Sequence, residues 1–193
     1  MKVGILVFNE VEVLDFAGPF EVFSLAEALD RTKIFDVKLV GQTMQTLKAR
    51  NGLQVVPNCS FEDHPPFDIV IIPGGYGAEE IEINNPVVIE WISEQYRSVK
   101  ILASVCTGAF LLAKAGLLKN RKATTHWMDL DRLENDFEDI EVIRDTKYVD
   151  QGKIITSGGI SAGINMSFYL IKKLVGVEIT KNTARRMEYD IVI

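Results

Sequence analysis

Short apolar runs alternate with longer amphipathic stretches along the chain. The runs at residues 2–8 (KVGILVF), 68–72 (DIVII) and 100–105 (KILASV) are mostly apolar and of strand length. Runs of this kind are typical of parallel strands that are covered on both faces. The stretches between them carry apolar residues at helical spacing, with charged residues on the remaining positions. This alternation predicts a mostly parallel sheet between two layers of helices.

The same pattern predicts the remaining elements. Strands are expected at residues 2–8, 35–41, 68–72, 100–105 and 122–125, with a hairpin at 47–56 and paired short strands at 140–144 and 153–156. The hairpin rests on Asn51-Gly52, a strong turn signal between β-prone runs. Helices are expected at residues 16–29, 86–97, 108–119, 127–134, 161–174 and 178–188. No repeat, low-complexity tract or linker interrupts them, so residues 1–193 are expected to form one domain.

Charge and composition exclude several classes of function. The 193 residues carry 21 Lys+Arg against 27 Asp+Glu, a net charge of −6, which argues against an electrostatically driven nucleic-acid binder. No apolar run approaches the roughly 18 residues of a membrane span, and the first residues have the pattern of a buried strand rather than a signal peptide. Two cysteines make no disulfide framework, so a reducing cytoplasm is expected.

Unusual segments follow several of the predicted strands. They are residues 9–19, 73–77, 106–108 and 124–127. In open α/β sheets, ligands bind beyond the carboxyl ends of the strands. The sequence therefore predicts a functional site at this edge of the sheet.

Cys106 stands where a predicted buried strand passes directly into a helix. This is the thiol counterpart of a nucleophile elbow, and the free N–H groups of the helix start are expected to lower the pKa of the thiol. A small buried core cysteine is the alternative, and the position favours the nucleophile. Cys59 lies in a loop rich in proline and polar residues and is interpreted as structural or incidental.

Three further segments offer partners for the thiol. The glycine-rich loop places the Gly75 N–H where, together with the Thr107 N–H, it could support a charged intermediate. Asp15 fits two roles, the cap of the first helix and a proton donor and base beside the thiol. His126 fits a Cys–His pair or a polar corner that orients the chain. The two histidines and two cysteines lack metal-ligand spacing, so no metal is expected.

With these residues in view, the chain resembles the ThiJ/PfpI superfamily over nearly its whole length, and within it the branch of isonitrile (isocyanide) hydratases. The resemblance rests on LDFAGPFEVF, FDIVIIPGG, SVCTGAFLLAKAGLL, KATTHW, SGGISAGI and RRMEYD. It implies a flavodoxin-like three-layer α/β sandwich, a homodimer, and a nucleophile on the elbow. At the matching positions it implies Cys106 as nucleophile, Asp15 as acid and base, and Gly75 and Thr107 as the backbone donors.

The sequence departs from other branches of the superfamily. Protease- and deglycase-like relatives generally carry Glu where this chain has Asp15, and many protease-like relatives have His where it has Thr107. A peptidase is therefore disfavoured, and a glyoxalase or deglycase is the second choice. The core also resembles the sensing half of some AraC-type regulators, but the chain reaches Ile193 without a helix-turn-helix module, so DNA regulation by this chain is not expected.

The leading hypothesis is a cysteine-dependent hydration of an isocyanide to an N-substituted formamide, without metal or organic cofactor. The expected partner is a small electrophilic molecule, with no nucleic acid and no membrane. One alternative keeps the enzyme and changes the electrophile to a 2-oxoaldehyde. Another is a redox or small-molecule sensor built on an accessible, low-pKa Cys106. Tyr76, Trp127 and Ile160 are candidate pocket walls that the sequence does not distinguish from core residues.

Overall fold

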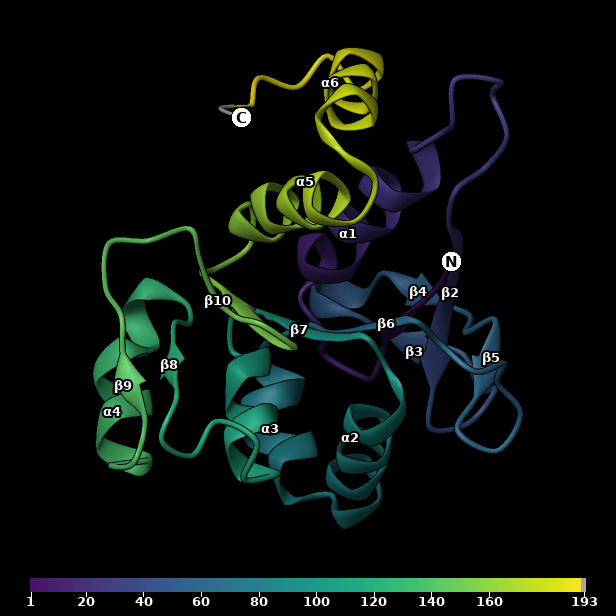
Figure 1. Ribbon diagram of the computed structural model, residues 1–193. Helices are drawn as coiled ribbons and strands as arrows, with labels where there is room; N and C mark the ends of the chain where they lie inside the picture. Colours follow the sequence, from purple (N-terminus) through teal and green to yellow (C-terminus); the bar gives the residue numbers. More distant parts are fainter. Residues whose placement is uncertain (192–193) are drawn as a thin grey trace.

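The computed structural model describes residues 1–191 and shows one large sheet between layers of helices (Figure 1). The strand order is β10-β11-β7-β6-β1-β2-β5, and all neighbours are parallel except β10 and β11, which pair antiparallel. The strands of this sheet are β1 (Lys2–Leu6), β2 (Asp36–Gly41), β5 (Cys59–Ser60), β6 (Ile69–Ile72), β7 (Ile101–Val105), β10 (Tyr148–Gln151) and β11 (Ile154–Ser157).

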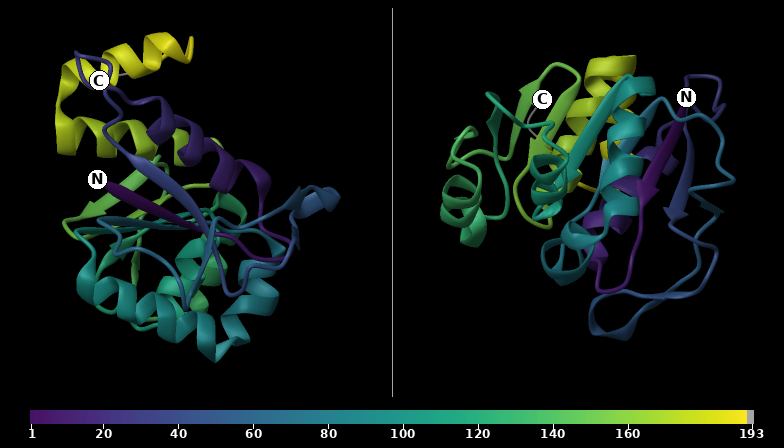
Figure 2. Two further views of the ribbon diagram at one scale, coloured as in Figure 1. Left: turned by 90° about the vertical axis from the view of Figure 1, so that its right-hand side faces the viewer. Right: turned by 90° about the horizontal axis from the view of Figure 1, so that it is seen from below.

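Helices cover both faces of the sheet (Figures 1 and 2). One face carries α1 (Val13–Leu25), α5 (Ala162–Val175) and α6 (Val177–Arg186), and the other carries α2 (Pro86–Ser98) and α3 (Gly108–Lys114). A small unit beside the sheet contains α4 (Leu130–Asp136), β8 (Lys122–Ala123) and β9 (Glu141–Val142). The predicted flavodoxin-like α/β sandwich is confirmed. Among residues 1–191, no helix combines the length and the apolar character that crossing a membrane requires.

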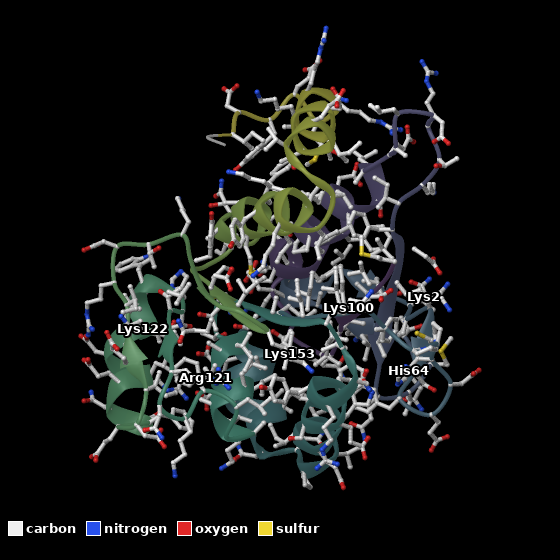
Figure 3. All side chains as sticks on the ribbon, viewed as in Figure 1. Lys2, His64, Lys100, Arg121, Lys122 and Lys153 are labelled. Carbon is white, nitrogen blue, oxygen red and sulfur yellow. The ribbon has the colours of Figure 1, made fainter. Side chains whose placement is uncertain are left out.

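The central strands form the middle of the core. Every residue of β6 and β7 is buried, because helices cover both sheet faces at these strands. The continuous apolar runs that predicted these strands are therefore completely buried in the fold. Side chains fill the space between the layers, and the labelled charged residues Lys2, Lys100 and Arg121 belong to the ends of strands or to loops (Figure 3).

Two helices differ in extent from the sequence-based expectation. α1 begins at Val13 rather than residue 16, which places Asp15 in its first turn, and it ends at Leu25. α3 ends at Lys114 rather than residue 119. Gly116 follows with φ +72°, a left-handed conformation that a continuing helix does not allow.

The expected pairing of residues 140–144 with 153–156 is wrong. β9 pairs in parallel with β8, whereas β11 lies between β7 and the antiparallel β10. The unpredicted strand β10 follows the turn at Asp145 and supplies the hairpin partner of β11. The hairpin at Asn51-Gly52 is confirmed, because β3 (Leu47–Lys48) and β4 (Gln54–Val55) pair antiparallel around it.

Candidate active site

Cys106 occupies the turn between β7 and α3. Its φ is 55°, a left-handed conformation that is strained for a residue with a side chain. Two hydrogen bonds hold the turn: the Cys106 N–H donates to the Gly158 carbonyl at 3.1 Å, and the Thr125 hydroxyl donates to the Cys106 carbonyl at 2.8 Å. A Cβ on Gly108 would stand 2.1 Å from the Ile72 carbonyl oxygen, so only glycine lets α3 begin this close to β6.

Asp15 is completely buried in the first turn of α1. Its Oδ2 accepts a hydrogen bond from the Gly74 N–H at 3.0 Å, and its Oδ1 is buried without a hydrogen bond of ordinary geometry. The N-cap of α1 is Glu12, so the capping alternative for Asp15 is wrong. The carboxyl instead joins α1 to the loop that follows β6.

The pKa of Asp15 is raised from 3.8 to about 7. Burial is the main cause, and the Gly74 N–H opposes it by stabilising the carboxylate. The charge of Glu12 raises the pKa further, while the Cys106 thiol and the Ile160 N–H lower it as weaker donors. Asp15 can therefore both hold and release a proton near neutral pH, as an acid–base group must.

Burial also raises the pKa of the Cys106 thiol, and the charge of ionised Asp15 raises it further. The N–H of Thr107 at the start of α3 lowers this pKa, as expected, but burial and Asp15 outweigh it, so the net shift is upward. The thiol is only 6% exposed, and α3 has only seven residues. The Thr107 and Ile160 N–H groups oppose the rise in pKa by facing the sulfur. The pair consequently favours one negative charge over two, and its proton rests on the Cys106 thiol, whose pKa is the higher of the two.

The redox-sensor hypothesis assumed an accessible thiol of low pKa. Cys106 is buried and its pKa is raised, so both parts of that assumption are wrong in this structure.

The backbone of Ile160 is the part of the site that the sequence did not reveal. Its N–H acts on both Cys106 and Asp15, and its φ of 51° is unusual for a β-branched residue. Ile160 follows β11, whose carboxyl end lies beside that of β7. The only sequence signal was its place just after a strand at the functional edge, in the segment SGGIS.

Gly75 and Thr107 lie close together, but their two backbone N–H groups are not both free to donate to a bound ligand. The Gly75 N–H donates to the Thr107 hydroxyl at 2.9 Å, so it reaches a bound intermediate only by giving up that bond. The Thr107 N–H faces the Cys106 sulfur. Gly75 itself has φ +111°, and a Cβ there would stand 2.5 Å from the Glu12 nitrogen, which explains the glycine.

His126 sits in a polar corner beside the pair. Its Nδ1 accepts from the Met128 N–H at 3.3 Å and lies 3.4 Å from the Asp129 carboxylate. A Cβ on Gly159 would stand 2.0 Å from the imidazole, so the ring packs directly on that backbone. In the described part of the chain, no hydrogen bond joins His126 to Cys106 or Asp15. The contacts match the orienting role that the sequence left open.

An open cavity of about 510 Å³ is lined by Thr125 and Gly158, which hydrogen-bond to the backbone of Cys106, although neither Cys106 nor Asp15 lines it. Ile160, His126 and Trp127 line it, together with the segment that follows β11 and the loop before β10. The three candidate wall residues are all partly exposed and do not belong to the core: Tyr76, Trp127 and Ile160. Trp127 is the most open, with 74% of its surface exposed.

The other cysteine and histidine lie elsewhere. Cys59 belongs to the edge strand β5 rather than to a loop, is buried, and directs its thiol to the Leu39 carbonyl at 3.8 Å. His64 accepts from the Trp91 indole N–H at 3.2 Å, and Figure 3 shows it on the opposite side of the molecule from Lys122. Both cysteines are free, and residues 1–191 contain no cluster of three or more His, Cys, Asp or Glu side chains placed to hold a metal ion.

Comparisons with known proteins find relatives that match most of the chain. The chain is 34% identical to the isonitrile hydratase of Pseudomonas putida, over 98% of this chain and 78% of that protein. It is 25% identical to the HTH-type transcriptional regulator GbdR of Pseudomonas aeruginosa, of whose length it spans about half (51%). It is 27% identical to the glutathione-independent glyoxalase DJR-1.2 of Caenorhabditis elegans, over 86% of this chain and 87% of that protein.

A solved structure shows the same fold. A ThiJ/PfpI family protein from Pseudomonas syringae superimposes with a TM-score of 0.83 at 25% identity, covering 100% of this chain and 76% of that one. Residues 1–173 match the DJ-1/PfpI family as a whole. The match includes Asp15, Cys106 and the loop that carries Ile160. The chain therefore belongs to the DJ-1/PfpI family.

Proposed function

We propose that the protein is an isonitrile hydratase, a lyase that adds water to an isocyanide to form an N-substituted formamide. The observation that carries the proposal is the buried Asp15 beside the Cys106 thiol, with a pKa of about 7. This arrangement supplies a nucleophile together with a group that first donates and later accepts a proton. The 34% identity to the P. putida enzyme along nearly the whole chain supports the choice of substrate.

The first half of the reaction consumes the proton that the pair holds. With this proton on Asp15, the Cys106 thiolate faces the N–H groups of Thr107 and Ile160. The sulfur attacks the terminal carbon of the isocyanide and forms a C–S bond, while Asp15 delivers its proton to the same carbon. The product is a thioimidate, R–N=CH–S–Cys106, and an ionised Asp15.

The second half uses ionised Asp15 as the base. Asp15 takes a proton from water, whose oxygen bonds to the thioimidate carbon, and passes that proton to the substrate nitrogen as charge develops there. The C–S bond then breaks, which releases the formamide, and the proton of the added hydroxyl returns to the Cys106–Asp15 pair. The Thr107 N–H, and the Gly75 N–H once it leaves the Thr107 hydroxyl, support the charged intermediate. The sum is one isocyanide and one water converted to one formamide.

The test is formamide production by purified protein from a panel of alkyl and aryl isocyanides. Turnover that disappears in Cys106→Ala and falls steeply in Asp15→Asn supports the proposal. No formamide from any panel member at high enzyme concentration overturns it. Cys59→Ala is the matched control, because Cys59 is a buried thiol on β5.

A second candidate is a glyoxalase acting on 2-oxoaldehydes, which the similarity to the C. elegans glyoxalase favours. The Cys106 sulfur would bond to the aldehyde carbon, and Asp15 would give its proton to the oxygen. Turnover of methylglyoxal that exceeds turnover of every isocyanide would select this reaction. We also expect a cytoplasmic homodimer, and light scattering that shows a monomer at micromolar concentration would contradict the dimer.

A further inference from the structure

The cavity of about 510 Å³ has two walls that come from different parts of the fold. One wall belongs to the small unit that stands beside the sheet in Figure 1, and it consists of residues 124–127 and Leu130. The other wall is the loop after β11, residues 158–162, and residues 145–147 complete the lining. Sites for small molecules usually measure about 300 to 1,000 Å³, so this cavity has room for one.

The loop after β11 serves both the cavity and the Cys106 thiol. Gly158 lines the cavity, and its carbonyl accepts the Cys106 N–H at 3.1 Å. Ile160 also lines the cavity, while its own N–H faces the Cys106 sulfur. Between them, a Cβ on Gly159 would stand 2.0 Å from the imidazole of His126, so the two walls are in direct contact there. A molecule bonded to the sulfur therefore has this cavity just beyond Ile160.

Trp127 is the large apolar group that this cavity leaves uncovered. The indole lines the cavity and is 74% exposed, and its ring centroid lies 5.9 Å from that of His126. The imidazole in turn packs on Gly159, so the indole is placed close to the loop that surrounds the sulfur. An aromatic ring gains more from a second ring, stacked with an offset or edge to face, than from a saturated group of equal size.

The charges of the lining favour neither sign. Lys147 and Asp145 are the two charged residues, one positive and one negative. The feature of the lining that can select a substituent is therefore the indole face of Trp127. An isocyanide is linear at its nitrogen, so a substituent is held away from the sulfur that attacks the terminal carbon. This shape suits a cavity that Cys106 adjoins but does not line.

We propose that this cavity binds the substituent of the isocyanide and that Trp127 makes the site prefer an aromatic substituent to a saturated one of similar size. The inference rests on the proposed function, because it names the substrate class for that reaction. Trp127 touches the substituent and sets specificity, whereas Cys106 and Asp15 carry out the chemistry.

The first experiment compares kcat/KM for phenyl isocyanide and cyclohexyl isocyanide, two six-membered rings, in wild type and Trp127→Leu. We expect the ratio of phenyl to cyclohexyl to fall about three- to tenfold in the variant, through a higher KM for the phenyl compound. The difference in intrinsic reactivity cancels because both compounds are measured in both proteins. Trp127→Phe keeps an aromatic ring and should keep part of the preference. An unchanged ratio in Trp127→Leu overturns the inference and leaves the hydratase in place.

Met128→Leu is the matched control. Met128 follows Trp127 in the same turn, η4 (Trp127–Asp129), and is 68% exposed, but it is not among the residues that line the cavity. Its replacement should leave the ratio of phenyl to cyclohexyl unchanged. A ratio that falls equally in Met128→Leu and Trp127→Leu would trace the effect to the turn as a whole and contradict the contact with the indole.

The second experiment needs no turnover. N-(4-nitrophenyl)formamide is an analogue of the expected product, and its nitroaromatic ring quenches the fluorescence of an indole that it contacts. Of the two tryptophans, Trp91 is only 4% exposed, so quenching by a bound ring reports on Trp127. We expect saturable quenching in wild type and loss of the saturable part in Trp127→Phe, whose remaining indole is Trp91.

The outcomes separate the inference from the proposed function. Quenching that rises linearly without saturation, or saturable quenching that persists in Trp127→Phe, overturns the binding of the ring beside Trp127. Saturable quenching that depends on Trp127, in a protein that hydrates no isocyanide, would remove the proposed function and leave the cavity as a site for an aromatic group.

Discussion

Asp15 accepts a hydrogen bond from the backbone N–H of Gly74 at 3.0 Å, and this bond ties the first turn of α1 to the loop after β6. The bond fixes one carboxyl oxygen and leaves the other, Oδ1, free of ordinary hydrogen bonds beside the Cys106 thiol. A fully buried carboxyl held in this way is oriented for proton transfer rather than for solvent.

Asp15→Asn should therefore retain the fold and lose the acid–base chemistry. The amide oxygen still accepts from the Gly74 N–H, but the side chain cannot deliver a proton to the substrate carbon. We expect kcat for isocyanide hydration to fall about 10²- to 10⁴-fold, measured by formamide release. Near-wild-type turnover in a variant with an unchanged circular dichroism spectrum would remove Asp15 from the mechanism.

Asp15 should also make stability depend on pH. Because its folded pKa of about 7 is raised above 3.8, its contribution to stability is fully present below pH 4 and is lost as the pH rises through 7. Wild type therefore loses on the order of 4 kcal/mol of unfolding free energy across this window relative to Asp15→Asn.

Urea unfolding of both proteins at pH 5 and pH 8 measures this difference, because other titrating groups cancel between them. We expect the stability of the variant relative to wild type to increase from pH 5 to pH 8. A difference that stays constant would mean that the carboxyl titrates alike in the folded and unfolded chains.

Gly108 begins α3 and Gly116 follows its end, and the two positions require glycine for different reasons. Gly108 is required because a side chain would not fit, and Gly116 because its backbone has a positive φ. A Cβ on Gly108 would collide with the Ile72 carbonyl oxygen at 2.1 Å, so Gly108→Ala should destabilise the protein by about 3 kcal/mol or more. Gly116 has φ +72° and open space around it, so Gly116→Ala should cost about 1 kcal/mol through its backbone alone. Equal losses in chemical denaturation would contradict the close approach of α3 to β6.

The hydrogen bond between Trp91 and His64 predicts a local contribution to stability away from the site. The indole N–H is buried and donates to His64 Nε2, and the imidazole also stacks on Phe67 with centroids 5.0 Å apart. His64→Phe keeps the stacking and leaves the indole N–H without its acceptor, so it should cost about 1–3 kcal/mol. His64→Gln restores an acceptor and should recover part of that loss in thermal unfolding. Equal stability of the two variants would show that the bond contributes nothing.

The sequence predicted those features that depend on local pattern. The buried strands and the turn at Cys106 followed from apolar runs and from glycines, which act over a few residues. Strand pairing at residues 140–156 was predicted wrongly, because pairing partners depend on the whole sheet and the half-buried strand β10 has no apolar run.

The electrostatics of the site lay beyond sequence reasoning for a similar reason. The raised pKa of Cys106 depends on burial and on Asp15, which is distant along the chain. The engagement of the Gly75 N–H by Thr107 and the strained backbone at Ile160 are likewise contacts between separate strand ends. Position at the sheet edge identified the segments, but only their packing determines which N–H group faces which atom.

Cys106 should be slow to oxidise, in contrast to a redox-sensing cysteine. Oxidation by peroxide requires an accessible thiolate, and Cys106 is 6% exposed with a pKa raised by burial and by ionised Asp15. In Asp15→Asn the neighbouring charge is gone, so the pKa of the thiol falls and oxidation should accelerate several-fold at pH 8. Peptide mass spectrometry of Cys106 after mild peroxide measures both rates. Rapid sulfinic acid formation in wild type, no slower than in the variant, would show that Asp15 does not suppress the thiolate and would return the sensor hypothesis to consideration.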